Sequence, residues 1–415
     1  MLSPPATAAA LPLLVAAPML RPSSPRSLTL SERAEALQPS LTLAIAARAK
    51  ALKAEGKDIC SLSAGEPDFD TPAFIRQAAI EALEAGQTRY GPAAGEPALR
   101  EAIAAKLTNE NNVPTSAEQV LVTNGGKQAL YNLFQVLLGP GDALLLPAPY
   151  WLSYPEMARL AGASVSLIPC SAADGFRLDP QRLEAAITAN SKLLVLNSPG
   201  NPTGMVLSRA ELEAIAEVLR RHPQVAVVCD EIYEFLLAPG QSHHSLAAVA
   251  PDLADRIFSV NGCAKGWAMT GWRIGWLAGN TAVVKAASAL QSQSTSNVCT
   301  FAQYGALAAV SGSRDCVRAM AAQFTERRSL LSDGLQAING LQLLPPEGAF
   351  YAFPDVSSTG LDSMTFCNRL LEEQGLAVVP GGAFGDDRCI RLSCAASGET
   401  IRDGLQRLER FIASL

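Results

Sequence analysis

The stretch Val225-Ala-Val-Val-Cys229-Asp230 combines an unbroken apolar run with a carboxylate that follows it directly. Alternation of apolar and polar residues is typical of a strand with one wet face, whereas a continuous apolar run is typical of a strand buried on both faces. Similar short runs, each bounded by Gly, Pro or Asn, occur at Val120–Val122, Leu144–Leu146, Leu193–Leu196, Ile257–Val260 and Ile274–Leu277. Together they predict a mainly parallel sheet covered by helices, which is the α/β class.

Helical patterns lie between these runs. Thr71 is predicted to cap a helix that starts at Pro72 and ends at Gly86, because apolar residues recur between them at helical spacing. Ser208 and Glu211 have the spacing of a capping box, which predicts the start of a second helix. Strands that alternate with helices in this way indicate one large α/β domain in the middle of the chain.

The last third of the chain has a different pattern. It opens with helices, continues with apolar runs at 348–353 and 389–392, and closes with an amphipathic helix. We therefore expect a smaller α+β domain, to which a helix near 41–52 also belongs. The predicted organisation is a disordered extension over 1–30, an N-terminal arm and part of the small domain over 31–65, the large domain over 66–305, and the small C-terminal domain over 306–415.

Composition excludes several classes of protein. Lys+Arg 33 against Asp+Glu 39 gives a net charge of −6, without the basic clusters that bind nucleic acid. The nine cysteines are scattered without a C-x-x-C pair, so the sequence does not predict a zinc site. Their pattern favours reduced thiols and therefore a cytoplasmic location. The apolar stretch Ala8–Leu20 contains prolines and is shorter than the ~20 residues of a membrane helix, so no membrane partner is expected. The doublet His243-His244 is interpreted as a solvated loop.

Loops that follow strands are where ligands bind in open α/β sheets. Gly125 and Gly126 lie between a strand and a helix, a pattern that suits phosphate binding through backbone N–H groups but also describes an ordinary tight turn. Asn201 lies in the rigid turn Asn197-Ser-Pro-Gly-Asn-Pro-Thr-Gly204, which could fix its amide or be purely structural. Asp230 would be either solvated or paired with a positive group in the cleft.

Two basic residues lie in apolar surroundings. Lys265 is the only charged residue between Arg256 and Arg273. Such a lysine tends to have a lowered pKa and a reactive neutral amine, unless its side chain reaches water. Arg391, in the run Cys389-Ile-Arg-Leu392, needs a partner, and a carboxylate is the natural one. A phosphate site, a carboxylate that faces a cation and a reactive lysine together favour pyridoxal 5′-phosphate as the cofactor.

A set of motifs also runs in order along the chain: Ser63-Ala-Gly-Glu-Pro-Asp-Phe-Asp-Thr-Pro72, Tyr90-Gly-Pro-Ala-Ala-Gly95, Gly125-Gly-Lys-Gln128, Pro149-Tyr-Trp151, Asn197 to Gly204, Asp230-Glu-Ile-Tyr233, Lys265-Gly-Trp-Ala-Met-Thr-Gly-Trp-Arg273 and Arg391-Leu-Ser393. With these motifs, the sequence from about residue 31 onward resembles class I aminotransferases of fold type I. It is most similar to the bacterial subgroup of aspartate and aspartate/prephenate aminotransferases. The resemblance implies a seven-stranded, mainly parallel sheet in the large domain, pyridoxal 5′-phosphate as cofactor and a homodimer.

The resemblance also implies roles around the cofactor. Lys265 would condense with the cofactor's carbonyl and later move a proton, and Asp230 would keep the pyridine nitrogen protonated. Tyr233 and Asn201 would bind the ring's phenolic oxygen, while Trp151 would stack on the ring. Phosphate binding falls to Gly125, Gly126 and Arg273, with Tyr90 reaching the phosphate from the partner subunit.

For the substrate, the resemblance implies that Arg391 and the backbone of Gly65 bind the α-carboxylate, on a site that Trp151 and Asn201 also line. Lys127 and Thr42 match positions that bind the distal carboxylate in the subgroup. The expected reaction is the transfer of an amino group from an L-amino acid, most of all L-aspartate, to 2-oxoglutarate by a two-step ping-pong mechanism.

Three alternatives stay open at this point. Prephenate transamination and carbon–sulfur β-elimination would use the same fold, although Gln38 stands where the subgroup often has lysine, which weakens the extension to prephenate. The third alternative is a non-catalytic regulator that binds the cofactor. It is disfavoured because residues 1–30 cannot supply a DNA-binding helix-turn-helix.

Overall fold

The computed structural model describes residues 28–37 and 41–415. A first compact unit ends at Leu37 and contains one short helix, α1 (Glu32–Ala36). The rest of the chain forms a second unit, which carries all the other elements. Most of the predicted disordered extension, residues 1–27, lies outside the described residues.

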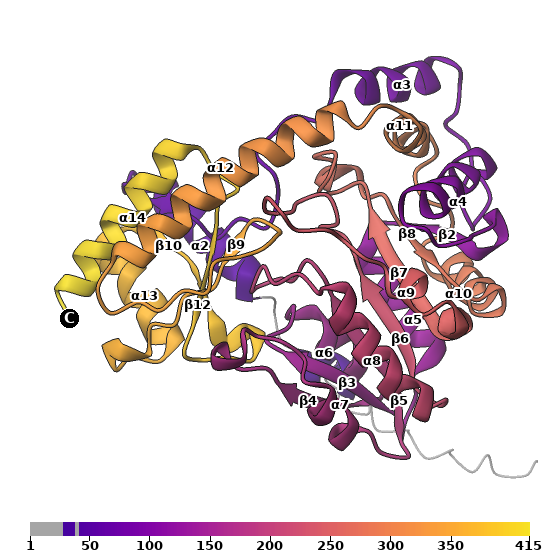
Figure 1. Cartoon of the computed structure of the whole chain (residues 1–415). Helices are drawn as coiled ribbons and strands as arrows, with labels where there is room; N and C mark the ends of the chain where they lie inside the picture. Colours follow the sequence, from indigo (N-terminus) through magenta and orange to yellow (C-terminus); the bar gives the residue numbers. More distant parts are fainter. Residues whose placement is uncertain (1–27, 38–40) are drawn as a thin grey trace, which may run out of the picture. The chain divides into compact units, whose positions relative to one another are not determined.

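A seven-stranded sheet forms the centre of the second unit (Figure 1). Strand β8 is antiparallel to both of its neighbours, and the other neighbouring strands are parallel to one another. The sheet is therefore mainly parallel, which confirms the predicted fold class. In sheet order the strands are β2 (Val120–Thr123), β8 (Gly275–Ala278), β7 (Ile257–Gly262), β6 (Ala226–Asp230), β5 (Ser191–Asn197), β3 (Ala143–Ala148) and β4 (Ser164–Pro169).

Helices cover both faces of this sheet. Because successive side chains of a strand point to opposite faces, Val227 and Cys229 pack into one apolar layer and Val228 into the other. The first layer is completed by α7 (Pro180–Ala186), α8 (Arg209–Arg221) and α9 (Leu246–Val249), and the second by α5 (Gly126–Leu137), α6 (Ser153–Leu160) and α10 (Thr281–Ser294). At the β2 and β8 edge the packing partners are α3 (Ala73–Glu84), α4 (Pro97–Glu110) and α11 (Thr300–Ser311).

Of the two predicted helix starts, one is confirmed and one is wrong. The Ser208 hydroxyl accepts a hydrogen bond from the Glu211 N–H at 3.3 Å, and the Glu211 carboxylate accepts one from the Ser208 N–H at 2.8 Å, so a capping box opens α8. Helix α3, however, begins after Pro72 without a side-chain cap. The Thr71 hydroxyl instead donates to the Ala268 carbonyl at 2.7 Å, which anchors the loop that follows Lys265.

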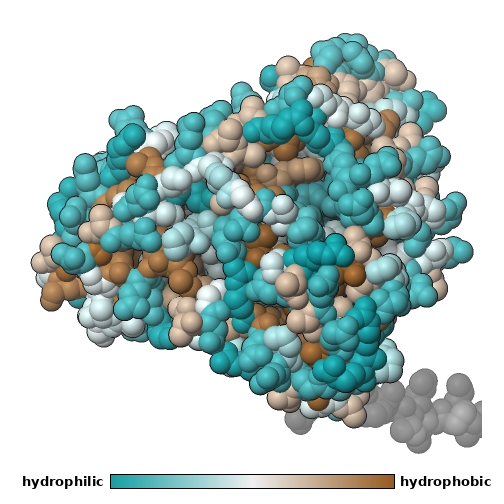
Figure 2. All heavy atoms as spheres, viewed as in Figure 1, coloured by the Kyte–Doolittle hydropathy of each residue, from teal (hydrophilic) through white to brown (hydrophobic). Residues whose placement is uncertain are grey.

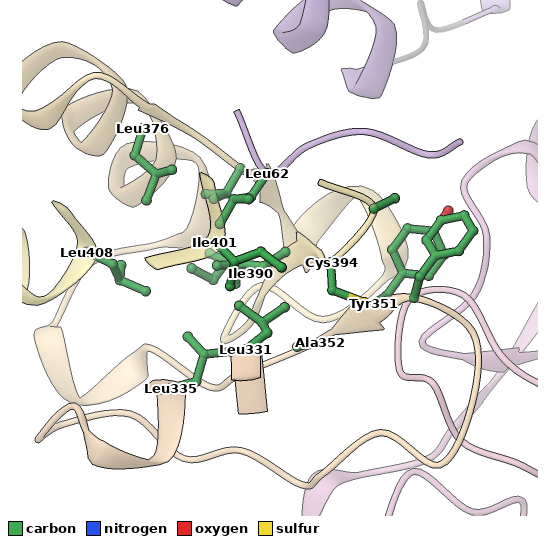
Figure 3. Packing of buried hydrophobic residues seen from close by; sticks show 14 of the residues in the cluster. Leu62, Leu331, Leu335, Tyr351, Ala352, Leu376, Ile390, Cys394, Ile401 and Leu408 are labelled. Atoms are coloured by element: carbon green, nitrogen blue, oxygen red, sulfur yellow. The ribbon is translucent and has the colours of Figure 1, made fainter. Parts of the chain in front are cut away.

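The remaining elements pack around smaller sheets. β11, β12 and β9 form an antiparallel sheet, and β1 pairs in parallel with β10. Figure 3 shows their shared core, in which Leu62 from near β1 meets Leu331, Ile390 and Leu408 from the C-terminal part. These elements are α2 (Leu41–Ala54), β1 (Cys60–Ser61), α12 (Asp315–Ala337), β9 (Tyr351–Ala352), α13 (Ser363–Gln374), β10 (Leu376–Ala377), β11 (Val379–Pro380), β12 (Ile390–Ser393) and α14 (Gly398–Ala413).

On the face in view, hydrophilic residues are spread over the surface with hydrophobic residues between them (Figure 2). Within the described ranges, 28–37 and 41–415, no helix is both long enough and apolar enough to cross a membrane.

Candidate active site

A cavity of about 1220 Å³ lies where β5 and β6 end, the edge at which open α/β sheets bind ligands. Its lining includes Asn197, the last residue of β5, and Asp230, the last residue of β6. Tyr90 is 92% exposed and does not line the cavity. All the other residues predicted for the site do: Thr42, Gly65, Gly125, Gly126, Lys127, Trp151, Asn201, Asp230, Tyr233, Lys265, Arg273 and Arg391.

Lys265 follows β7 and faces the cavity rather than bulk water. Its Nζ donates a hydrogen bond to the carbonyl of Gly65. It lies 5.9 Å from the centre of the Tyr233 ring and 5.6 Å from that of Phe350. Burial lowers the pKa of Lys265 to about 8, because the charged amine loses its water, and the negative charge of Glu66 opposes this shift. The amine is therefore neutral more often at physiological pH than that of a free lysine.

Asp230 is buried, so the interpretation as a solvated carboxylate is wrong. Its Oδ2 accepts a hydrogen bond from the Tyr154 hydroxyl at 2.8 Å, and its Oδ1 accepts one from the Ile232 N–H at 3.3 Å. Burial raises the pKa of Asp230 to about 6, and these two hydrogen bonds oppose the increase. A carboxylate held in this way can bind a positively charged group in the cavity.

The loop between β2 and α5 has the features of an anion site. Gly125 has φ +79°, and a Cβ there would come within 2.6 Å of the Arg273 guanidinium. No side chain caps the first turn of α5, so its N–H groups can bind a ligand. Arg273 is held beside the loop because it donates to the carbonyls of Thr270 at 2.9 Å and Asn124 at 3.2 Å. An ordinary tight turn would require neither the arginine nor the uncapped helix start.

Arg391 is a buried guanidinium on β12, 2% exposed. It donates to Asn201 Oδ1 at 3.0 Å and to the Ser63 carbonyl at 3.1 Å. The guanidinium carbon lies 4.4 Å from the centre of the Tyr351 ring and 4.9 Å from that of Phe384. Among the described residues no carboxylate pairs with it, and its Nε has no hydrogen-bond partner. These features suit a carboxylate ligand, which accepts two parallel hydrogen bonds from arginine.

Two further polar groups of the cavity lack partners within the described part of the chain. Lys127 has an exposed side chain on α5, its Nζ lies 5.0 Å from the centre of the Trp151 ring, and no carboxylate pairs with it. The hydroxyl of Thr42, in the first turn of α2, is buried without a hydrogen bond.

Two tyrosines of the site were missed by sequence reasoning. Tyr154 binds Asp230, and the Tyr351 hydroxyl lies 3.0 Å from that of Tyr233. A signal was available for Tyr351, because its hydroxyl lies in the apolar run Gly348-Ala-Phe-Tyr-Ala-Phe353 and needs a buried partner there. The signal gives no indication of which distant residue is the partner. Tyr154 has Glu156 and Arg159 in its own helix, so its segment gives no such signal.

The prediction that His243 lies in a solvated loop is also wrong. Its side chain is 9% exposed, and Nε2 lies 3.6 Å from a carboxylate oxygen of Glu231. The two residues are brought together only by the fold, so the local composition of the loop misled the prediction.

Comparison with known proteins places the chain in a family. The family described as aminotransferase class I and II matches residues 57–408. The chain is 46% identical over 386 residues to the aspartate/prephenate aminotransferase of Thermus thermophilus, a match that covers 92% of this chain and 98% of that protein. It is 44% identical over 396 residues to the probable aspartate/prephenate aminotransferase of Rickettsia bellii, covering 93% and 99%. A solved structure of the Thermus thermophilus aspartate aminotransferase with maleate matches with a TM-score of 0.88 at 45% identity and covers 93% and 100%.

The chain therefore belongs to the class I and II aminotransferases, and its cofactor is pyridoxal 5′-phosphate. The residues of the cavity fit this cofactor. Arg273 and the space that Gly125 leaves beside it suit a phosphate, Asp230 suits a protonated ring nitrogen, and the amine of Lys265 suits the carbonyl.

Proposed function

We propose that this enzyme transfers the amino group of L-aspartate, or of a similar dicarboxylic amino acid, to 2-oxoglutarate in two half-reactions at one site. The observation that carries the proposal is a pair of cations, Arg391 and Lys127, that line the same cavity as Lys265 and have no acidic partner among the described residues. Aspartate and 2-oxoglutarate each bring two carboxylates, one for each cation. Maleate, which accompanies the Thermus thermophilus enzyme in its solved structure, is likewise a dicarboxylate.

Arg391 would bind the α-carboxylate as a bidentate pair, through N–H groups that include the free Nε. Its position is fixed before substrate arrives, because Asn201 and the aromatic ring of Tyr351 hold the guanidinium. Lys127 and Thr42 would bind the distal carboxylate. A monocarboxylic amino acid would leave these last two groups without a partner.

When bound, pyridoxal 5′-phosphate supplies an electron sink for the negative charge that remains on the substrate's α-carbon after proton removal. Lys265 would take that proton at Nζ, since its lowered pKa makes the neutral amine available. Asp230 would accept a hydrogen bond from the ring nitrogen and hold its proton in place. Tyr154 supports this role because its hydroxyl hydrogen bond favours the charged form of the carboxylate.

The reaction class is tested by Lys265→Ala. We expect the variant to lose transamination and also the absorbance band of the covalently attached cofactor. Lys127→Leu is the matched control, because it removes a lysine from the same cavity and should keep the band. A Lys265→Ala enzyme that kept both properties would contradict the proposal.

The substrate class is tested by the kinetics of Lys127→Leu. KM for aspartate should rise by roughly tenfold or more, the cost of losing one charge-assisted contact, while KM for alanine stays nearly unchanged. Arg391→Gln is the comparison variant and should raise KM for both amino acids, since both have an α-carboxylate. Equal effects of Lys127→Leu on aspartate and alanine would refute distal-carboxylate binding by Lys127.

Prephenate is the second candidate substrate, because both relatives described above carry it in their names. Gln38, the residue that weakens this extension, lies outside the described residues. Product analysis with prephenate and with a cystathionine-like substrate separates prephenate transamination and carbon–sulfur β-elimination from the proposed reaction. The non-catalytic regulator is rejected if any of these substrates turns over.

A further inference from the structure

Glu231 is a second buried carboxylate directly beside Asp230. Along β6 the side chain of Cys229 packs into the layer of α8, whereas that of Asp230 lines the active-site cavity on the other face. Glu231 follows the same alternation and does not line the active-site cavity. Its side chain is 3% exposed, and its Oε2 has no hydrogen-bond partner among residues 28–37 and 41–415.

The other two charged residues close to His243, Glu234 and Lys106, are paired with each other. Glu234 contacts Lys106 at 2.5 Å and accepts a hydrogen bond from Asn111 at 2.8 Å. Lys106 is thus engaged by Glu234, and only His243, 3.6 Å away, pairs with Glu231 in the described structure.

Two more charged residues line a small cavity of about 350 Å³ beside His243, namely Glu110 and Arg209. Each has its own partner: Glu110 pairs with Arg314 at 2.5 Å, and Arg209 with Glu213 at 2.9 Å. The charge balance around His243 therefore consists of two carboxylates, Glu231 and Glu234, against one fixed cation, Lys106. A protonated imidazole completes the balance, whereas a neutral one leaves a buried carboxylate unpaired.

We propose that His243, in its imidazolium form, is a positioning residue for the cofactor ring, because it neutralises Glu231 and thereby keeps neighbouring Asp230 ionised. The inference rests on the proposed role of Asp230 as the partner of the ring nitrogen. Burial lowers the pKa of His243, but the two carboxylates outweigh burial, so the net pKa is raised. For Asp230, burial is the main cause of the raised pKa, and the charge of Glu231 adds to it.

The first test observes His243 in the wild-type holoenzyme. The chain has three histidines, so a protein labelled with ¹³C-histidine gives few ring signals, and His243→Gln assigns one of them. We expect the His243 signal to remain that of the imidazolium above pH 6.5, the ordinary pKa of a histidine side chain. In Glu231→Gln its titration should move to lower pH. A neutral His243 over about pH 6 to 8, or a titration that is the same in Glu231→Gln, overturns the proposal.

The second test measures how strongly the holoenzyme retains its cofactor on dilution as a function of pH. In His243→Gln, the adjacent carboxylates Asp230 and Glu231 take up a proton more readily. The pH below which the enzyme loses its cofactor should therefore rise by about one unit. His244→Gln is the matched control and should show no shift.

The double variant Glu231→Gln/His243→Gln separates charge balance from packing. It removes the unpaired carboxylate, so cofactor retention should return to the wild-type profile. The proposal would be overturned if the double variant retained its cofactor less well than either single variant. It would also be overturned if the pH profile of cofactor retention were unchanged in His243→Gln. Neither test measures transamination of any substrate, so a wrong substrate assignment leaves the outcome unchanged. The titration of wild-type His243 also remains decisive if Glu231→Gln or the double variant fails to fold.

Discussion

At the scale of single residues, the role proposed for Asp230 in catalysis is accompanied by a cost in stability. Its pKa is raised from 3.8 to about 6 by burial, so the folded protein without cofactor holds the charged form at a penalty. The contribution of this group to stability is greatest below its unfolded pKa and is lost as the pH rises through about 6. A shift of this size corresponds to about 3 kcal/mol.

Asp230→Asn should therefore have opposite effects on stability and activity. Without cofactor, we expect the variant to be more stable than the wild type at pH 8, by at most about 3 kcal/mol, with the difference shrinking as the pH falls below 6. Its kcat should fall by at least about 100-fold, because an amide cannot keep the ring nitrogen protonated. Denaturant unfolding at several pH values checks the first expectation, and a difference that is independent of pH would contradict it.

Tyr154 should act through the same carboxylate. Tyr154→Phe removes the 2.8 Å hydrogen bond to Asp230 and should lower kcat/KM by about tenfold, the effect of one hydrogen bond to a charged group. Tyr150→Phe is the matched control, since the Tyr150 hydroxyl makes no hydrogen bond within the described residues. Steady-state kinetics at pH 7.5 would compare the two variants, and equal effects would refute a specific role for Tyr154.

Single residues also mark the limit of prediction from the sequence. Lys265, Asp230 and Arg391 could be found because each is a charged group in an apolar run, which is a local signal. Tyr154 was missed and His243 was interpreted wrongly because their partners are distant in the sequence, and the strength of a buried hydrogen bond or ion pair depends on that partner.

At the scale of elements, the start of α5 depends on two glycines with different constraints. Gly125 has φ +79° and no room for a Cβ beside Arg273, whereas a Cβ at Gly126 would only touch Val260 at 3.4 Å. The first glycine is therefore required by backbone conformation and space, and the second only by modest packing.

Gly125→Ala should weaken cofactor binding by about tenfold or more, because the strained backbone costs about 1–3 kcal/mol and Arg273 is displaced. Gly126→Ala keeps every backbone N–H and should change the affinity by less than about threefold. Titration of the protein with pyridoxal 5′-phosphate measures both constants. A larger effect at Gly126 than at Gly125 would refute an anion site at the start of α5.

The elements differ in how well they could be predicted. The central strands were found because burial on both faces requires continuous apolar runs. Strand β4 was missed because it lies at the sheet edge and its sequence, Ser164-Val-Ser-Leu-Ile-Pro169, is largely exposed and only partly apolar. The cap at Thr71 was predicted wrongly because a hydroxyl before a helix can serve another element, here the loop at Ala268.

At the scale of the whole molecule, the division into a large domain over 66–305 and a small domain over 306–415 stays a prediction. The pairing of β1 with β10 supports the assignment of part of 31–65 to the small domain, because it joins Cys60–Ser61 to the C-terminal sheets. The proposed homodimer in the cytoplasm likewise stays a proposal, and Tyr90 offers a way to test the dimer.

Tyr90 is 92% exposed and absent from the cavity of its own chain, as a residue would be that completes the site of a partner subunit. Tyr90→Ala should therefore weaken cofactor binding, and mixing it with inactive Lys265→Ala subunits should restore activity. In a mixed dimer, the subunit with Lys265 receives an intact Tyr90 from its partner. Random exchange of equal amounts would give about a quarter of wild-type activity, measured at a cofactor concentration that leaves Tyr90→Ala alone inactive. If Tyr90 acted within its own chain, every site in the mixture would lack one of the two residues and no activity would return.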